Sequence, residues 1–268
     1  MRTILSITDP DDPRVAAYRD IRERDLVGRE GRFVAEGEVV LGLLARSTRH
    51  RAESVLIDAK RADKLAPLLA TFADDVPIYG AGQAVVDAIA GFHLHRGILA
   101  IGARGPEPSA AELLATLGDG AVVLALFGIS NHDNMGGLFR NAAAFGADAV
   151  LLDANCCDPL YRKAIRVSVG HALTVPFARL APGEDPLALL GNAGFEALSL
   201  TPVGATPLSE LQRPRRAAVL LGTEGEGLPA AVIAGSTPVG IAMAPGVDSL
   251  NVAVTAGIVL HHLKFAQA

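Results

Sequence analysis

Two kinds of hydrophobic pattern alternate along the second half of the chain. Short runs of consecutive apolar residues are separated by stretches in which apolar residues recur every three or four positions. The runs predict strands buried on both faces, and the stretches predict amphipathic helices. Strands that alternate with helices form a parallel sheet covered by helices on both faces. We therefore predict an α/β domain with a parallel sheet over residues 119–268.

The elements of this domain follow one another through short connections. The predicted strands are 121–127, 148–153, 195–200, 216–222 and 239–243. The predicted helices are 134–145, 159–172, 185–193 and 249–265, with an extended segment at 174–180. Open parallel sheets bind ligands beyond the carboxyl ends of their strands. We therefore expect the chemistry in the loops that follow residues 127, 200, 222 and 243.

The first part of the chain predicts a smaller α/β domain. Strand-like segments at 32–35, 53–58, 76–79 and 97–103 alternate with helical segments at 15–26, 38–46 and 60–71. The stretch ARGPEPSAAE (103–112) combines glycine, two prolines and serine between two apolar runs, which is typical of a linker. We place a linker at 106–118, between a domain at 1–105 and a domain at 119–268.

Composition narrows the class of protein. Half of the residues are apolar and a fifth are charged, as in ordinary globular proteins. No apolar run reaches the roughly 20 residues that a membrane helix needs, and the N-terminus turns acidic and proline-rich too early for a secretory signal. The two cysteines, Cys156 and Cys157, are adjacent, and no pair has metal-site spacing. We expect a cytoplasmic protein with structural thiols and no metal.

Charge is distributed unevenly along the chain. The net charge is −5, but residues 1–104 hold 15 basic and 15 acidic residues, whereas residues 105–268 hold 9 and 14. The basic residues of the first part are mostly arginines, at positions 14, 19, 22, 24, 29, 32, 46, 49 and 51. Such a cluster suits contact with phosphates. The alternative, a solvated surface paired with the acidic residues nearby, stays open.

Small polar residues and glycines follow the strand predicted at 121–127. Asn134 can cap the next helix, and Gly136 and Gly137 allow close approach to its first turn. Arg140 follows among apolar neighbours, where an arginine is expected to have a role. The alternative is a surface arginine whose stem lies on apolar residues.

Two further polar clusters follow later strands. LLGTEGEGLP (220–229) matches neither the dinucleotide nor the P-loop pattern, and its Glu224 is either functional or a solvated turn residue. In the other cluster, Ser249, Leu250 and Asn251 open an apolar helix that Asp248 or Ser249 could cap. Asn251 then lies in the first turn and should be hydrogen-bonded.

Together these clusters resemble a known family. The patterns N-x-G-x-x-x-R-x-A-x-x-F-G (134–146), G-x-E-x-x-G-L (222–228) and S-L-N-V (249–252) resemble, in order and spacing, the three motifs of the SpoU, or TrmH-like, RNA 2′-O-ribose methyltransferases. RFVAEGEVV (32–40) and HRGILAI (95–101) resemble the N-terminal RNA-binding domain of that family. The resemblance covers nearly the whole chain.

The resemblance implies a fold, a cofactor and partners. The C-terminal domain would carry a deep trefoil knot, a rare exception to the rule against knotted chains. S-adenosylmethionine would be held in that knot, and the protein would be a homodimer acting on ribosomal or transfer RNA. The cofactor-binding positions implied by the motifs are Leu200, Thr201, Gly222, Ile241, Met243 and Leu250. At position 242 this chain has alanine where the family usually has proline, in Ile241-Ala242-Met243.

The resemblance also implies a catalytic set. Arg140 would be the principal residue, with Asn134, Glu224, Ser249 and Asn251 ordering it and the ribose. A guanidinium whose pKa is above roughly 12 is a weak base, so we expect Arg140 to stabilise developing charge and to fix the geometry. The group that takes the hydroxyl proton stays open. The expected RNA contacts are Arg32, Arg46, Arg49 and Arg166.

Two other functions compete with an RNA methyltransferase. One is an RNA-binding protein on the same fold without activity, which the intact Arg140, Glu224, Ser249 and Asn251 argue against. The other is an unrelated α/β enzyme that uses a nucleotide cofactor. The missing phosphate-binding patterns argue against that reading.

Overall fold

The chain folds into two compact units. The computed structural model describes residues 2–19, 26–91, 93–94, 96–202, 206–223 and 225–265. The first unit is Met1–Pro106 together with Leu160–Thr174, and the second is Glu107–Pro159 together with Val175–Ala268. Each unit has its own sheet and its own buried core.

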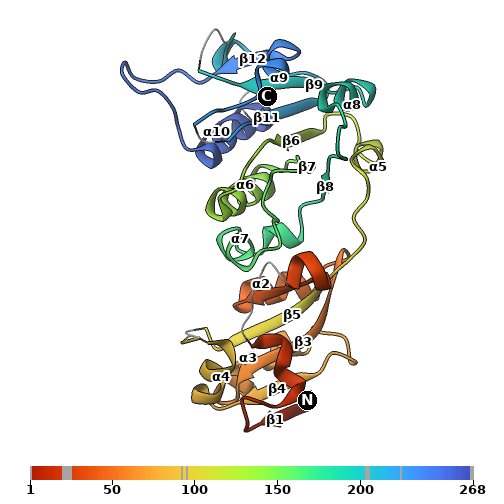
Figure 1. Ribbon diagram of the computed structural model, residues 1–268, viewed down its shortest axis with the longest axis vertical. Helices are drawn as coiled ribbons and strands as arrows, with labels where there is room; N and C mark the ends of the chain where they lie inside the picture. The colour runs from red at the N-terminus through yellow and green to blue at the C-terminus, as the bar shows by residue number, and fades with distance from the viewer. Residues whose placement is uncertain are drawn as a thin grey trace. The chain divides into compact units, whose positions relative to one another are not determined.

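The first unit is built on a five-stranded sheet in the order β1-β4-β3-β5-β2 (Figure 1). Its strands are β1 (Ile4–Ile7), β2 (Arg32–Glu36), β3 (His50–Asp58), β4 (Ile78–Ala81) and β5 (Ile98–Arg104). The three neighbours β1, β4 and β3 run parallel, whereas β5 is antiparallel to both β3 and β2. Of these strands, β1 was not predicted, because only four residues alternate before Asp9 and Pro10 end the pattern.

Helices cover the sheet of the first unit. They are η1 (Pro13–Tyr18), η2 (Leu26–Glu30), α2 (Glu38–Ala45), η3 (Ala59–Arg61), α3 (Ala62–Leu69) and α4 (Gln83–Ala90). Tyr18 is fully buried in this core and shares a 2.7 Å hydrogen bond with the hydroxyl of Ser54. The helix predicted at 15–26 is a 3-10 helix up to Tyr18, and its residues 20–25 lie outside the described part.

A segment from the second half of the chain completes the first unit. It contains α7 (Arg162–Val167) and η4 (His171–Leu173), where the sequence predicted one helix at 159–172. Arg162 on α7 donates to the carboxylate of Glu36 on β2 at 2.8 Å, and their side chains are only 18% and 10% exposed. Because this ion pair joins residues 126 positions apart, the local pattern gave no sign that residues 160–174 belong with the first unit.

The predicted linker contains a helix. α5 (Ala110–Ala115) begins with a capping box, in which the Ser109 side chain and the Glu112 side chain each accept from the other residue's backbone N–H. Leu113 and Leu114 of this helix are buried in the core of the second unit. The second unit therefore begins at Glu107, within the proline-rich stretch, and the residues predicted as a linker belong to this unit.

The second unit is built on a seven-stranded sheet in the order β10-β12-β9-β11-β6-β7-β8. Its strands are β6 (Val122–Leu126), β7 (Ala149–Leu152), β8 (Phe177–Arg179), β9 (Glu196–Leu200), β10 (Thr206–Pro207), β11 (Ala217–Leu221) and β12 (Thr237–Gly240). All the strand pairs are parallel. The predicted parallel α/β sheet is thus confirmed.

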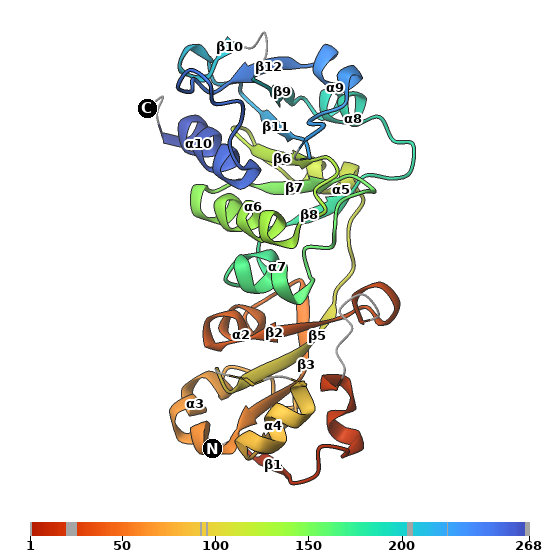
Figure 2. The same ribbon diagram turned by 60° about the vertical axis from the view of Figure 1, so that its left-hand side comes forward.

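Two layers of helices enclose this sheet (Figure 2). α6 (His132–Phe145) and α10 (Val252–Phe265) pack together on one face, whereas α5, α8 (Pro186–Asn192) and α9 (Ala230–Ala234) cover the other. A 3-10 helix, η5 (Leu208–Glu210), follows β10. Every residue of the two central strands, β6 and β11, is buried, as their unbroken apolar runs predicted.

Helix α6 begins two residues earlier than predicted, and its N-cap lies three residues earlier. Asn131, not Asn134, is its N-cap, and its side chain accepts from the backbone N–H of Asp133 at 2.7 Å. Two asparagines three residues apart are equally good caps in the sequence. Asn134 is therefore in the first turn, with its side chain buried.

Candidate functional site

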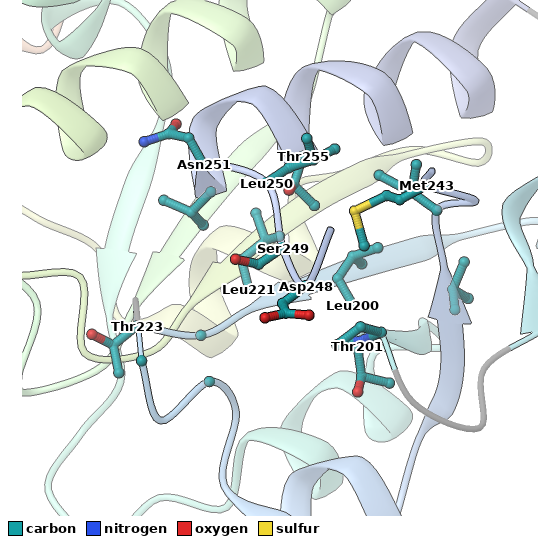
Figure 3. Close-up of a pocket in the computed structure, with 17 residues that line it drawn as sticks. Leu200, Thr201, Leu221, Thr223, Met243, Asp248, Ser249, Leu250, Asn251 and Thr255 are labelled. Carbon is teal, nitrogen blue, oxygen red and sulfur yellow. The ribbon is translucent and has the colours of Figure 1, made fainter. Parts of the chain in front are cut away.

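A pocket of about 660 Å³ opens at the carboxyl ends of β9, β11 and β12 (Figure 3). Three of the four loops in which chemistry was expected therefore meet there, and only the loop after β6 does not line the pocket. The lining residues are Leu200, Thr201, Pro202, Leu221, Gly222, Thr223, Gly225, Gly227, Val239, Ile241, Met243, Asp248, Ser249, Leu250, Asn251, Val252 and Thr255. The size and the mainly apolar lining suit a small organic ligand.

The glycine-rich loop after β11 forms one wall of the pocket. Thr223 and Gly227 pair across the loop, with the Gly227 N–H donating to the Thr223 carbonyl oxygen at 3.1 Å. The return of the loop brings Gly227 so close that a Cβ on Gly222 would lie 2.2 Å from the carbonyl carbon of Gly227. The glycine at 222 therefore allows the loop to fold back on the end of the strand.

All six residues expected to bind the cofactor line this pocket. Leu200 and Thr201 come from the end of β9, Gly222 from the end of β11, and the others from the segment between β12 and α10. These positions are up to 50 residues apart in the sequence, and the parallel sheet brings them to one edge. Strand β12 ends at Gly240, so Ile241 and Met243 lie in an irregular segment and not in the strand predicted at 239–243.

Asn251 links the pocket to helix α6. Its side-chain oxygen caps α10 by accepting from the N–H groups of Ala253 and Val254, at 2.9 and 3.3 Å. Its amide donates to the side-chain oxygen of Asn134 at 2.9 Å. The expected hydrogen bonding of Asn251 is thus present, and Asn251 is the side chain that caps α10, in place of Asp248 or Ser249.

Close packing of α6 on α10 explains Gly137 of the first motif. A Cβ on Gly137 would lie 2.8 Å from the Cβ of Ala253, and the amide of Asn141 donates to the Ala253 carbonyl oxygen at 2.5 Å. The group that approaches Gly137 is therefore another helix of the same chain. This close approach places Asn134 beside Asn251, at one end of the pocket.

The structure does not bring every expected catalytic residue to the pocket. Ser249 and Asn251 line it, and Asn134 is bonded to Asn251. Arg140 is exposed on α6, is not a lining residue, and makes no hydrogen bond or ion pair within the described residues. Glu224 lies outside the part of the chain that the structure describes.

Some lining residues were not singled out from the sequence. Thr223 lies inside the second motif, and Thr255 lies one helical turn after Asn251, so that both could have been found from their positions. Asp248 was considered only as a helix cap, yet it faces the pocket (Figure 3).

The four arginines expected to contact RNA all lie in the first unit. Arg46 at the end of α2 and Arg166 on α7 are exposed. Arg49 is half-buried. Arg32 forms ion pairs with Glu30 and Glu53, at 3.1 and 2.8 Å. Arg166 was expected in the second domain, but the packing of α7 places it with the others.

The cysteines have no reactive environment. Both are free thiols, and burial raises the pKa of Cys156 to about 12 and that of Cys157 to about 11. Both side chains are therefore protonated at neutral pH. In the described part of the chain, no three metal-binding side chains gather at one place, and no helix has the length and apolar character to cross a membrane.

The chain is similar to known methyltransferases along its whole length. The model of the SpoU rRNA methylase family matches residues 121–261. An uncharacterised tRNA/rRNA methyltransferase of Mycobacterium tuberculosis is 40% identical, over 96% of this chain and 91% of the relative. The chain belongs to the SpoU rRNA methylase family. Members of this family are RNA methyltransferases that use S-adenosylmethionine, so the family resemblance drawn from the three motifs is confirmed.

Solved structures agree with this assignment to the SpoU family. A crystal structure of an RNA 2′-O ribose methyltransferase has 26% identity and a TM-score of 0.76, over 97% of this chain and 98% of that one. An rRNA methyltransferase from Sinorhizobium meliloti with bound AdoMet has a TM-score of 0.80, over 99% of both chains. At 21% identity, that second likeness establishes the fold alone.

Proposed function

We propose that this SpoU-family protein transfers the methyl group of S-adenosylmethionine to a ribose 2′-hydroxyl of ribosomal or transfer RNA. The observation that carries the proposal is the pocket at the carboxyl ends of β9, β11 and β12. Its lining contains all six positions that the family motifs imply for the cofactor. The similar crystal structure described as an RNA 2′-O ribose methyltransferase supports the choice of the ribose hydroxyl.

The residues present fit such a cofactor. Leu200, Leu221 and Ile241 offer apolar surface for a nucleoside, and Thr201, Thr223 and Ser249 offer hydroxyl groups. When bound, S-adenosylmethionine supplies a methyl group activated by its sulfonium. The chain itself has to orient the acceptor hydroxyl and stabilise the charge that develops on it.

Arg140 is proposed to act on the acceptor side. Its guanidinium is exposed and unpaired within the described residues, so it is available to a ribose and its neighbouring phosphate, to which arginine binds with two parallel hydrogen bonds. The bonded pair Asn134 and Asn251 would fix the end of the pocket nearest to α6. Glu224 is proposed to order the same centre from the glycine-rich loop.

The first unit is proposed to bind the RNA. Arg46 and Arg166 are exposed there, and neither has a hydrogen bond or ion pair within the described residues, so their charges are available to phosphates. Arg49 is proposed to assist them. Arg32 is a weaker candidate, because Glu30 and Glu53 already neutralise it.

A homodimer and a knot complete the proposal. Exposed apolar side chains recur at intervals of four, four and seven residues along α10 and the segment before it, at Leu250, Val254, Ile258 and Phe265. This is the spacing of one helix face that packs on a partner. A second copy of the chain is proposed to cover this face. The knot is proposed for the segment 241–251. Ile241, Met243 and residues 248–251 of this segment line the pocket together with the loops after β9 and β11.

Replacing Val254 by aspartate is expected to convert the dimer to a monomer, because the charge would be buried at the interface. Sedimentation of the two proteins at micromolar concentration measures the change. Val247→Asp is the matched control, since Val247 is exposed but lies outside the helix. A wild-type protein that sediments as a monomer would refute the dimer.

Two measurements test the proposed function. Calorimetry of the full chain with S-adenosylmethionine is expected to give a dissociation constant in the micromolar range, as a pocket of this size allows. Mapping of ribose methylation in total RNA, with and without the gene, is expected to reveal at least one nucleotide that loses its 2′-O-methyl group. If the protein does not bind S-adenosylmethionine at high micromolar concentrations, the proposal of an enzyme is refuted. If the protein binds RNA but methylates none, the alternative of an inactive RNA-binding protein is favoured.

A further inference from the structure

One carboxylate in the pocket has no part in the proposed mechanism. Asp248 lies between β12 and α10, next to Ser249, and lines the pocket. In Figure 3 its carboxylate points into the open space below Ser249, between Thr223 and Thr201. It is therefore directed at whatever fills the cavity.

The pocket offers this carboxylate no positive partner. Among the described lining residues, Asp248 is the only one with a charged side chain. Within the described residues its carboxylate has no ion pair or hydrogen bond, and Asn251, not Asp248, caps α10. A helix cap and an ion pair, the ordinary structural roles of an aspartate at this position, are thus both missing.

The ligand can supply the missing positive charge. S-adenosylmethionine carries a positive ammonium group and a permanent positive charge on its sulfur. The product, S-adenosylhomocysteine, keeps the ammonium group but has a neutral thioether in place of the sulfonium. A ligand that fills the pocket also displaces water, and this strengthens the attraction between the remaining charges. A carboxylate that lies close to the sulfur therefore distinguishes the donor from the product, whereas one close to the ammonium group would attract both equally.

We propose that Asp248 recognises the positive charge of the sulfonium and so makes the pocket prefer the methyl donor over the demethylated product. Asp248 is thus a specificity-determining residue. When the methyl group leaves, the charge on the sulfur disappears and the attraction disappears with it. The product is then held less tightly and leaves the pocket. This inference rests on the proposed function, because it assumes that S-adenosylmethionine is the ligand.

Three ligands of similar shape show whether the charge of the ligand determines its affinity. They are S-adenosylmethionine, S-adenosylhomocysteine and sinefungin, in which an amine-bearing carbon replaces the sulfonium and keeps a positive charge. All three share the adenosine and the amino-acid group. Calorimetry of the wild-type chain is expected to show both charged ligands binding about fivefold more tightly than S-adenosylhomocysteine, the magnitude of an exposed ion pair.

The variant Asp248→Asn keeps the shape of the side chain and removes its charge. We expect this variant to bind S-adenosylhomocysteine with the wild-type affinity. Its affinity for S-adenosylmethionine and for sinefungin is expected to fall to the value for S-adenosylhomocysteine, so that the variant no longer prefers the charged ligands. Asp248→Glu is expected to keep the preference. The matched control is Asp119→Asn, since Asp119 is an exposed aspartate that precedes β6 and pairs with Arg215. Asp119→Asn is expected to bind all three ligands with the wild-type affinities.

Two results would overturn the inference. One is an equal loss of affinity for all three ligands in Asp248→Asn, which would mean that Asp248 binds the amino-acid group they share. The other is an unchanged preference. In both cases the wild type still binds the donor, so the proposed function stands. Failure of the wild type to bind any of the three ligands refutes the proposed function itself.

Discussion

Replacing Arg140 by alanine is expected to lower the rate of RNA methylation by at least about 100-fold, the usual cost of removing a group that stabilises developing charge. The affinity for S-adenosylmethionine is expected to stay at the wild-type value, because Arg140 does not line the pocket. The melting temperature is also expected to stay unchanged, since the side chain is exposed and bonded to no described residue. Single-turnover methylation and calorimetry, on the same preparations, measure the two effects separately.

Two further variants define what Arg140 does. Arg140→Lys keeps the charge but loses the two-pronged geometry of the guanidinium, so we expect it to recover only part of the activity. Arg213→Ala is the matched control, because Arg213 is a partly exposed arginine of the same unit whose side chain donates to the carbonyl oxygen of Gly120. Wild-type activity in Arg140→Ala would refute the role proposed for this residue. A loss of cofactor affinity would assign it to the cofactor instead.

Replacing Gly222 by alanine is expected to weaken the binding of S-adenosylmethionine by at least about 100-fold. The new Cβ would lie 2.2 Å from the carbonyl carbon of Gly227 and 2.4 Å from the Leu228 nitrogen. These are backbone atoms, so the whole loop must move away from the end of β11. Overpacking of this kind costs about 1–3 kcal/mol of stability. We therefore expect a lower melting temperature as well as weaker binding.

The control for Gly222→Ala is Gly118→Ala. A Cβ on Gly118 meets no atom within 4 Å, and its backbone is outside the left-handed region. This variant is expected to bind the cofactor like the wild type. If Gly222→Ala keeps wild-type affinity, the close return of the glycine-rich loop does not shape the pocket. Calorimetry and thermal unfolding of the two variants decide this.

The strands of the second unit could be predicted because each is an uninterrupted apolar run. The predicted strands at 121–127, 148–153, 195–200 and 216–222 enclose β6, β7, β9 and β11 and exceed them by only one or two residues. Short elements were missed where the pattern is too brief to show a period, as in β10 and α9. The two units divide within the proline-rich stretch, between Pro106 and Glu107. Residues 107–118 belong to the second unit and not to a linker, because the capped helix α5 packs into its core.

The candidate site, like the fold, could be predicted from the sequence only in part. The three motifs named the family and all six expected cofactor positions, and the rule for parallel sheets gave their common edge. The glycine at position 137 predicted a close approach without naming the group that approaches, and Ala253 of α10 occupies that place. The capping side chain of α6 is Asn131 and not Asn134, and that of α10 is Asn251 and not Asp248 or Ser249. The choice depends on backbone angles that several nearby polar residues could satisfy equally well.

The sequence by itself determined the parallel sheet of this protein, its family and the loops after β9, β11 and β12 that line its pocket, since these depend on local periodicity and on motifs within one segment. Only the tertiary structure decided that residues 160–174 complete the first unit, because the buried pair of Arg162 and Glu36 joins distant segments. Only the tertiary structure showed that Asp248 lines the pocket. The direction of a side chain in an irregular segment depends on the packing of the whole chain around it, and no local pattern encodes that direction.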